Sequence, residues 1–308
     1  MNNRWIKLAG WILALVVGVF AVRTLLREWH ALVTQTVTWH VRPLYLLGAV
    51  LLVLVNYAIL IQAWRVMLAG WRQSLPFFES VRVWVVSGLG KYVPGKVWAV
   101  AGMAVMAQRG GVAAWAATAS AVVLQALSVG TGAAVVGLAG SARLQAEAPW
   151  ARIALISLIV ASAAGLALLL WPPVTRRLLQ LVRVSAPPEG SPGVRAVAVG
   201  LAANLVAWIS YGTSLWLLAH GLLDVPTLSL RVAIGAFAAS YVAGLLALFA
   251  PGGIGVRELV FLLMLDGVVG PGIAAALAIA SRLLLTLTEI GTALPFLILQ
   301  RGQRRAAD

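Results

Sequence analysis

The chain of 308 residues contains no cysteine and only three histidines (His30, His40 and His220), which lie far apart in sequence. Without cysteine, disulfide bonds, thiolate metal sites and cysteine nucleophiles are excluded. The sequence also lacks a Ser-His-Asp set, a carboxylate pair with acid–base spacing and a nucleotide-binding glycine loop. We therefore expect no catalytic residues, no metal and no cofactor, and a protein that is not an enzyme.

Charged residues are also scarce, at 10% of the chain, whereas 62% of the residues are hydrophobic. A soluble domain has about 25% charged and about 45–50% apolar residues, so the composition indicates a polytopic membrane protein. The net charge of +14 would suggest nucleic-acid binding in a soluble protein. Here the arginines flank apolar runs, which is typical of topology signals and of contacts with lipid headgroups. We expect membrane lipids with anionic or zwitterionic headgroups as partners, and no nucleic acid.

Long apolar runs predict an all-α protein with about six full membrane spans, each of which needs roughly 20 apolar residues. The first run has features of a secretory signal, but its length and the arginines after it favour an uncleaved span. The expected spans are residues 5–24, 43–70, 112–140, 150–171, 194–220 and 271–299.

Two pairs of shorter segments lie between these spans. The first pair, 77–93 and 96–108, is separated by Pro94-Gly95, and the second, 228–250 and 254–267, by Pro251-Gly252-Gly253. The second member of each pair would form about 20 Å of helix, less than the roughly 30 Å hydrocarbon core. We therefore expect two re-entrant helix hairpins broken at Pro and Gly.

The two hairpins also mark an internal repeat within a single transmembrane domain of residues 1–308. "SVRV" at 80–83 corresponds to "SLRV" at 229–232, and "ASAVVLQALSVGT" at 119–131 corresponds to "ASRLLLTLTEIGT" at 280–292. The halves would comprise residues 43–140 and 194–300. Basic flanks place both termini in the cytoplasm of an inner-membrane protein, so the hairpins enter from opposite sides. Such an inverted repeat is typical of transporters with a site at the midplane.

Irregular backbone at membrane depth is tolerated only where it is buried in protein or lines a watery cavity. We therefore expect both breaks to share one central cavity, where helix N-termini and basic side chains would bind an anionic headgroup. The candidate substrate-binding residues are Lys91, Tyr92, Pro94, Gly95 and Lys96 at the first break, Tyr241, Pro251, Gly252, Gly253, Gly255, Arg257 and Glu258 at the second, and Arg282 and Glu289 on one face of the last span.

Simpler interpretations exist for several of these groups. Lys91 and Lys96 would also be explained by side chains that reach the cytoplasmic surface. Glu258 would also be explained as a partner of the positive end of its own helix. We expect the polar residues Asn56, Gln62 and Asn204 to form hydrogen bonds between helices.

Two stretches resemble a known family. "GKYVPGKVW" at 90–98 and "PGGIGVRE" at 251–258, with their spacing, are similar to the lysylphosphatidylglycerol synthase transmembrane-region family. That family includes the flippase half of bacterial aminoacyl-phosphatidylglycerol synthases. The resemblance covers about residues 10–300 and implies movement of lipids between leaflets, but not synthesis. The implied role maps onto Pro94, Gly95, Lys96, Pro251, Gly252, Gly253, Gly255, Arg257 and Glu258.

The function expected from these observations is a flippase for a phosphate-bearing glyco- or aminoacyl-lipid. The alternatives are a translocase of a polyprenyl-phosphate-linked sugar or a hopanoid lipid, and a membrane-embedded transferase that uses a lipid-linked donor. The sequence leaves open the lipid, the transport direction and the energy source. It also leaves open a homo-oligomer and an associated lipid-modifying enzyme.

Overall fold

The computed structural model describes residues 39–92, 97–139, 149–171, 192–223, 225–247 and 250–305. These residues form helices and contain no strand beyond an isolated bridge between Trp39 and Leu223. The expected all-helical fold is therefore confirmed. The elements are α2 (Pro43–Gly70), α3 (Phe77–Gly88), η1 (Leu89–Tyr92), α4 (Val97–Arg109), α5 (Ala114–Ala139), α7 (Pro149–Leu170), α9 (Val194–Leu222), α10 (Leu230–Leu246), η2 (Pro251–Gly253), α11 (Val256–Val269) and α12 (Pro271–Arg305).

Among the described helices, four are long and apolar enough to cross a membrane. They are α2, α5, α9 and the part of α12 from Pro271 to Ile298, and they coincide with four of the six expected spans. The expected span 150–171 coincides with α7, a helix of 22 residues. The expected span 5–24 lies outside the described residues. These helices make the chain a multi-pass membrane protein.

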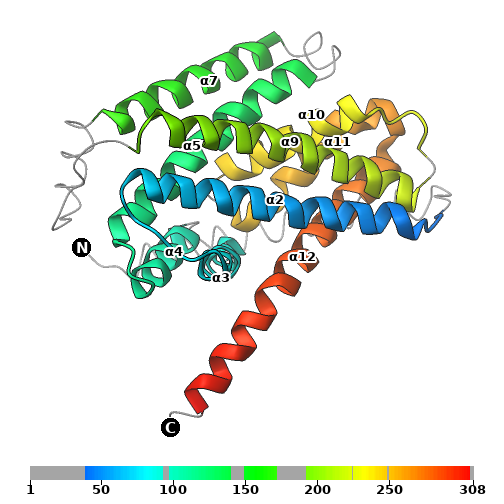
Figure 1. Cartoon of the computed structure of the whole chain (residues 1–308). Helices are drawn as coiled ribbons and strands as arrows, with labels where there is room; N and C mark the ends of the chain where they lie inside the picture. Colours follow the sequence, from blue (N-terminus) through cyan, green and yellow to red (C-terminus); the bar gives the residue numbers. More distant parts are fainter. Residues whose placement is uncertain are drawn as a thin grey trace, which may run out of the picture.

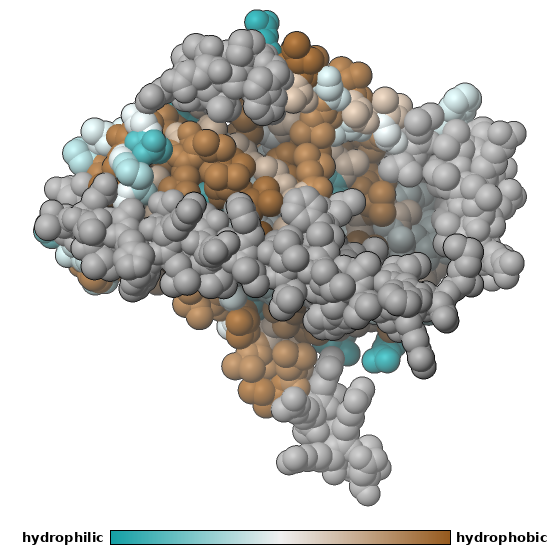
Figure 2. All heavy atoms as spheres, turned by 180° about the vertical axis from the view of Figure 1, so that it is seen from behind, coloured by the Kyte–Doolittle hydropathy of each residue, from teal (hydrophilic) through white to brown (hydrophobic). Residues whose placement is uncertain are grey.

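The outer surface of the bundle is apolar, as a lipid-facing surface must be. On α2 the exposed side chains Leu44, Leu47, Leu51 and Val55 follow one another at helical spacing. Figure 2 shows the same character over much of the described surface, including the part of α12 that projects from the bundle. In the described part of the chain, hydrophobic side chains therefore occupy much of the outer surface as well as the core.

The long helices pack closely because glycine lies where they cross. The helices α2 and α9 run side by side, and α7 lies against α5 at the edge of the bundle (Figure 1). A Cβ at Gly212 of α9 would lie 2.3 Å from Cα of Ile234, and one at Gly132 of α5 would lie 2.6 Å from a methyl carbon of Val242. Small residues at crossings are typical of membrane helices, where dispersion contacts drive association.

The chain contains two interrupted segments. At the first, α3 runs into the 3₁₀ turn η1 before α4, and the break expected at Pro94-Gly95 lies outside the described residues. At the second, η2 separates α10 from α11 at the expected Pro251-Gly252-Gly253, with Gly252 and Gly253 at φ of 56° and 72°. Positive φ is accessible mainly to glycine, so the "PGGIG" sequence specifies this turn. The turns η1 and η2 contact each other inside the bundle.

Candidate functional site

A cavity of about 310 Å³ lies beside the two breaks, inside the bundle. Its wall combines helices from α2 near the start of the described chain to α12 at its end. The polar and charged side chains in the wall include Tyr57, Lys91, Gln125, Ser128, Asn204, Tyr211, Tyr241, Arg257, Glu289 and Thr292.

Arg257 is the most unusual of these residues. It lies in the first turn of α11, its exposed fraction is 9%, and it lines the cavity. Its guanidinium carbon lies 5.0 Å from the ring centre of Tyr241 and 5.7 Å from that of Phe237. Within the described residues the guanidinium forms no ion pair or hydrogen bond, and its buried Nε has no partner. Among the described residues, the guanidinium is therefore in direct contact with aromatic rings and not with a carboxylate.

Both carboxylate oxygens of Glu258, the next residue, have partners. Its Oε2 accepts a hydrogen bond of 2.7 Å from the backbone N–H of Gly255, and its Oε1 forms an ion pair with Nη1 of Arg282. The carboxylate thus covers the N-terminus of its own helix, where the helix dipole favours a negative group. An anion bound in the cavity would therefore meet Arg257 instead of a bare N-terminus of α11.

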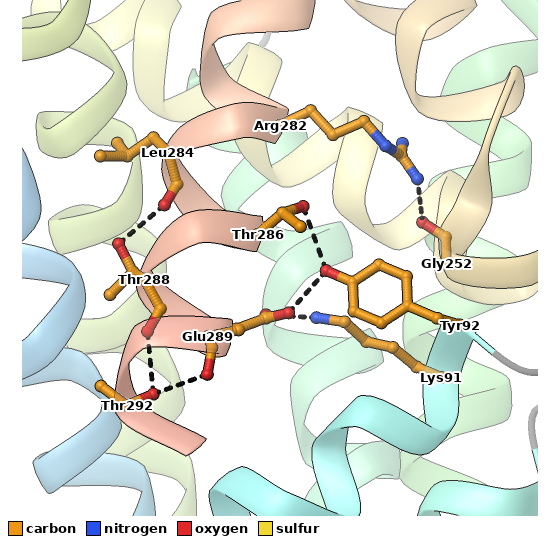
Figure 3. Close-up of polar contacts among 9 residues, drawn as sticks. All are labelled: Lys91, Tyr92, Gly252, Arg282, Leu284, Thr286, Thr288, Glu289 and Thr292. Atoms are coloured by element: carbon orange, nitrogen blue, oxygen red, sulfur yellow. Dashed lines mark hydrogen bonds and ion pairs between the residues drawn. The ribbon is translucent and has the colours of Figure 1, made fainter. Parts of the chain in front are cut away.

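Glu289 of α12 reaches the first break (Figure 3). It forms an ion pair with Lys91 through Oε1 and accepts a hydrogen bond of 2.7 Å from the hydroxyl of Tyr92 through Oε2. The same hydroxyl lies 3.1 Å from Oγ1 of Thr286, one turn earlier on α12. Lys91 therefore faces the interior of the bundle, which favours the first of the two interpretations of this lysine.

Arg282 connects α12 to the second break in the same way. Besides its ion pair with Glu258, it donates a hydrogen bond of 3.0 Å to the carbonyl of Gly252. Figure 3 shows Arg282 and Glu289 extending from α12 toward the two breaks. One helix thus holds both interrupted segments through two charged side chains. Glu289, which lines the cavity, is paired with Lys91, and Glu258, beside the second break, is paired with Arg282.

The structure brings most of the predicted site residues together. Gly252 lies beside Tyr92, since a Cβ on this glycine would be 3.4 Å from the tyrosine ring. Tyr241 packs on Arg257 and edge-on against Trp208. Pro251, Gly253 and Gly255 form the turn that leads into α11. Pro94, Gly95 and Lys96 lie outside the described residues.

Two of the three polar residues expected to join helices form no hydrogen bond between helices among the described residues. Asn56 donates a hydrogen bond of 3.3 Å to Ala207 of α9, as expected. Gln62 instead accepts one from Arg65 on its own helix, and Asn204 donates one to Gly200 on its own helix.

Four residues of the site were not singled out from the sequence. Tyr57 and Tyr211 line the cavity, Phe237 packs on Arg257, and Gly244 leaves the space that the Arg257 side chain occupies. The sequence offers one signal for the tyrosines: only five occur in the chain, and Tyr57 and Tyr211 each lie well inside an expected apolar span.

The described residues contain no group of three or more His, Asp or Glu side chains that could hold a metal ion. A comparison with known families finds that the model for the lysylphosphatidylglycerol synthase TM region matches residues 6–290. No curated protein matches the chain.

Proposed function

Because the chain belongs to the lysylphosphatidylglycerol synthase TM-region family, we propose that it moves a phosphate-bearing lipid between leaflets through the central cavity. The headgroup would enter the cavity and the acyl chains would stay in the bilayer. The cavity volume of about 310 Å³ suits this division. It is near the lower end of the range for small-molecule sites, roughly 300–1,000 Å³, and is too small for a whole lipid.

The observation that carries this proposal is the buried guanidinium of Arg257, which has no carboxylate partner among the described residues. An ionisable group inside a membrane protein is costly and is usually paired or functional. A guanidinium presents N–H donors in a fork that matches phosphate oxygens. Lys91, Arg257 and Arg282 outnumber Glu258 and Glu289 at the site, so one bound phosphate would balance its charge.

A phosphate near Arg257 would also be attracted to Lys91, because both cations line the same cavity. Lys91 would then be shared between the phosphate and Glu289, and Glu289 would keep its contacts with Lys91 and Tyr92.

We include the inverted repeat and the re-entrant hairpins in this proposal. The order of a long helix, an interrupted pair and a second long helix occurs as α2 to α5 and again as α9 to α12. The contacts between the halves are reciprocal, since α5 contacts α10 while α12 contacts α3. Both observations are expected of two halves related by a pseudo-two-fold axis in the membrane plane. We place both termini in the cytoplasm of an inner membrane.

We propose transport over group transfer, because Glu289 at the cavity and Glu258 beside it each bind a cation, so the described residues offer no free carboxylate as a general base. A diacyl phospholipid and a polyprenyl phosphate would engage the same guanidinium. Native mass spectrometry of lipids that purify with the protein separates these two substrates.

The test of the function is movement of fluorescent phospholipid between leaflets of proteoliposomes that contain the purified full-length protein. We expect Arg257→Gln to slow movement by about 10- to 100-fold, because a hydrogen bond to a charged group contributes about 1.5–3 kcal/mol. The matched control is Arg195→Gln, since Arg195 is exposed at the start of α9 and does not line the cavity. Movement by the wild type no faster than in empty liposomes would refute the function, and an unaffected Arg257 variant would refute the site.

A further inference from the structure

The wall of the cavity contains uncharged polar side chains in addition to the charged ones at the breaks. Gln125 and Ser128 lie three residues apart on α5 and therefore on one face of it. Asn204 lies on α9, which packs against α5. All three residues line the same cavity as Arg257.

The hydrogen-bonding groups of these side chains are largely free. Gln125 and Ser128 form no side-chain hydrogen bond with the part of the chain that the structure describes. Asn204 donates a hydrogen bond of 2.8 Å to the carbonyl of Gly200, and its Oδ1 has no partner among the described residues. Polar residues that join membrane helices would bond across the interface. These residues do not, so a role in helix association leaves them unexplained.

Tyr57 adds a fourth uncharged group on α2. Its hydroxyl is buried, lines the cavity and has no hydrogen-bond partner among the described residues. A buried hydroxyl without a partner costs free energy, which a bound ligand would recover. Hydroxyl and amide groups both donate and accept hydrogen bonds, as the hydroxyls of a polyol do.

An ammonium group would be recognised differently. It carries three donors and no acceptor, so it requires acceptor oxygens and favours a carboxylate. Glu289 already receives Lys91 and Tyr92, and Glu258 already receives Arg282 and the N–H of Gly255. The cavity therefore has a free cation and free neutral groups, but no free carboxylate among its described residues.

We infer that Gln125, Ser128 and Asn204 form a subsite for headgroup hydroxyls, and that the substrate is a phosphodiester with a neutral, polyhydroxylated headgroup. Glycerol and sugar headgroups belong to this class, whereas ammonium-bearing headgroups do not. This inference rests on the proposed function, because it assumes that the phosphate binds at Arg257. It deepens that function by naming the part of the lipid that lies next to the phosphate.

The test compares phosphatidylglycerol with phosphatidylmethanol of the same acyl chains. Both lipids are singly charged phosphodiesters, and only the first has headgroup hydroxyls. The full-length protein in detergent is mixed with equal amounts of the two lipids, and in a second sample with equal amounts of phosphatidylglycerol and phosphatidylethanolamine. The bound species are counted by native mass spectrometry. We expect phosphatidylglycerol to be bound about tenfold more, the effect of one or two hydrogen bonds. Equal binding, or preferred binding of phosphatidylethanolamine over phosphatidylglycerol, would overturn the inference.

Variants then locate the selectivity. In Gln125→Leu with Ser128→Ala we expect the binding ratio of phosphatidylglycerol to phosphatidylmethanol to fall toward one. The control is Thr118→Val, which also removes a hydroxyl from α5. Thr118 is exposed, and its hydroxyl donates a hydrogen bond of 2.9 Å to the backbone carbonyl of Ala114 in the same helix. A ratio that stays at the wild-type value in the double variant would refute the subsite.

Transport of phosphatidylglycerol in proteoliposomes is measured separately. Selective binding without movement would leave the subsite intact and refute the flippase function. Movement of lipid without preferred binding of phosphatidylglycerol would support the flippase function and refute the subsite.

Discussion

At the scale of single residues, Arg257 reaches the cavity because glycine lies opposite its side chain. A Cβ at Gly244 of α10 would be 2.4 Å from Cγ of Arg257, and one at Gly253 would be 3.1 Å from the same atom. The methylene groups of the arginine thus pass between two glycines, and its guanidinium packs on Phe237 and Tyr241. The position of the Arg257 guanidinium therefore depends on the absence of a side chain at Gly244 and Gly253.

This packing predicts the effect of Gly244→Ala. The added methyl group collides with the middle of the Arg257 side chain, so the arginine must move away from its aromatic neighbours. We expect a loss of about 1–3 kcal/mol of stability, as for other overpacked interiors, and weaker binding of phosphatidylglycerol. Thermal unfolding in detergent and native mass spectrometry measure the two effects.

The matched control for this prediction is Gly165→Ala in α7, where an added Cβ meets nothing within 4 Å. There the same substitution is expected to be neutral or stabilising, because alanine has the higher helix propensity. If Gly244→Ala were as stable as the control and bound lipid normally, the glycine would not determine the position of Arg257.

The sequence predicted the charged residues of the site better than the neutral ones. Arg257, Glu258, Arg282 and Glu289 are conspicuous because charge is rare in apolar segments. Tyr57 is not conspicuous in the sequence, because apolar residues surround it on all sides of α2. One side of this helix faces lipid and another faces the cavity, and both sides are mainly apolar. Helical periodicity distinguishes a core from water, but it does not distinguish a cavity from lipid when both surroundings are apolar.

At the scale of elements, α12 holds both breaks in place. Its Glu289 binds Lys91 and Tyr92 at η1, and its Arg282 binds Glu258 and Gly252 at the second break. The two charged residues lie seven positions apart, which is about two helical turns. A shift of α12 relative to either break would therefore exchange or break these contacts.

The Lys91–Glu289 contact predicts thermodynamic coupling between the two residues. We expect Lys91→Met and Glu289→Met each to lower stability by about 1.5–3 kcal/mol, because each leaves a charged partner inside the bundle. The double variant should lose clearly less than the sum, since an apolar pair replaces the ion pair without leaving a lone charge. Thermal unfolding of the four proteins in detergent measures the coupling.

A second double-mutant cycle on Arg82 and Glu79 serves as control. These residues form an ion pair of 3.1 Å three residues apart on α3, and Glu79 is 47% exposed. An exposed pair of this kind is expected to couple by less than about 1 kcal/mol. Equal coupling in both cycles would mean that the contact between α12 and η1 contributes no more than a surface pair.

Element boundaries were predictable where proline and glycine mark them. The span expected at 43–70 is α2, and the break expected at Pro251-Gly252-Gly253 is η2. The distant residues that the broken segments contact were not predictable from proline and glycine. Lys91 and Glu289 are 198 positions apart, and only the packing of the whole bundle brings them together. The sequence placed Arg282 and Glu289 on one face, but local spacing does not specify which distant residue each one meets.

At the scale of the whole molecule, the proposed inverted repeat has a consequence for the two segments that precede the interrupted helices. Residues 71–76 lie between α2 and α3, and residues 225–229 lie before α10. The proposed repeat makes these two segments equivalent. If the halves are inverted, these segments lie on opposite sides of the membrane. If the halves are parallel, they lie on the same side.

Single cysteines distinguish the two arrangements, since the chain has no cysteine of its own and gives no background labelling. Ser74→Cys and Thr227→Cys are small changes at exposed positions in these segments. We expect a membrane-impermeant maleimide to label Thr227→Cys from the outside of intact cells and Ser74→Cys only in inverted vesicles. The controls are the cysteine-free chain, which should stay unlabelled, and detergent-treated membranes, in which both variants should react. Labelling of both cysteines from one side would exclude the inverted repeat, and with it the entry of the two breaks from opposite leaflets.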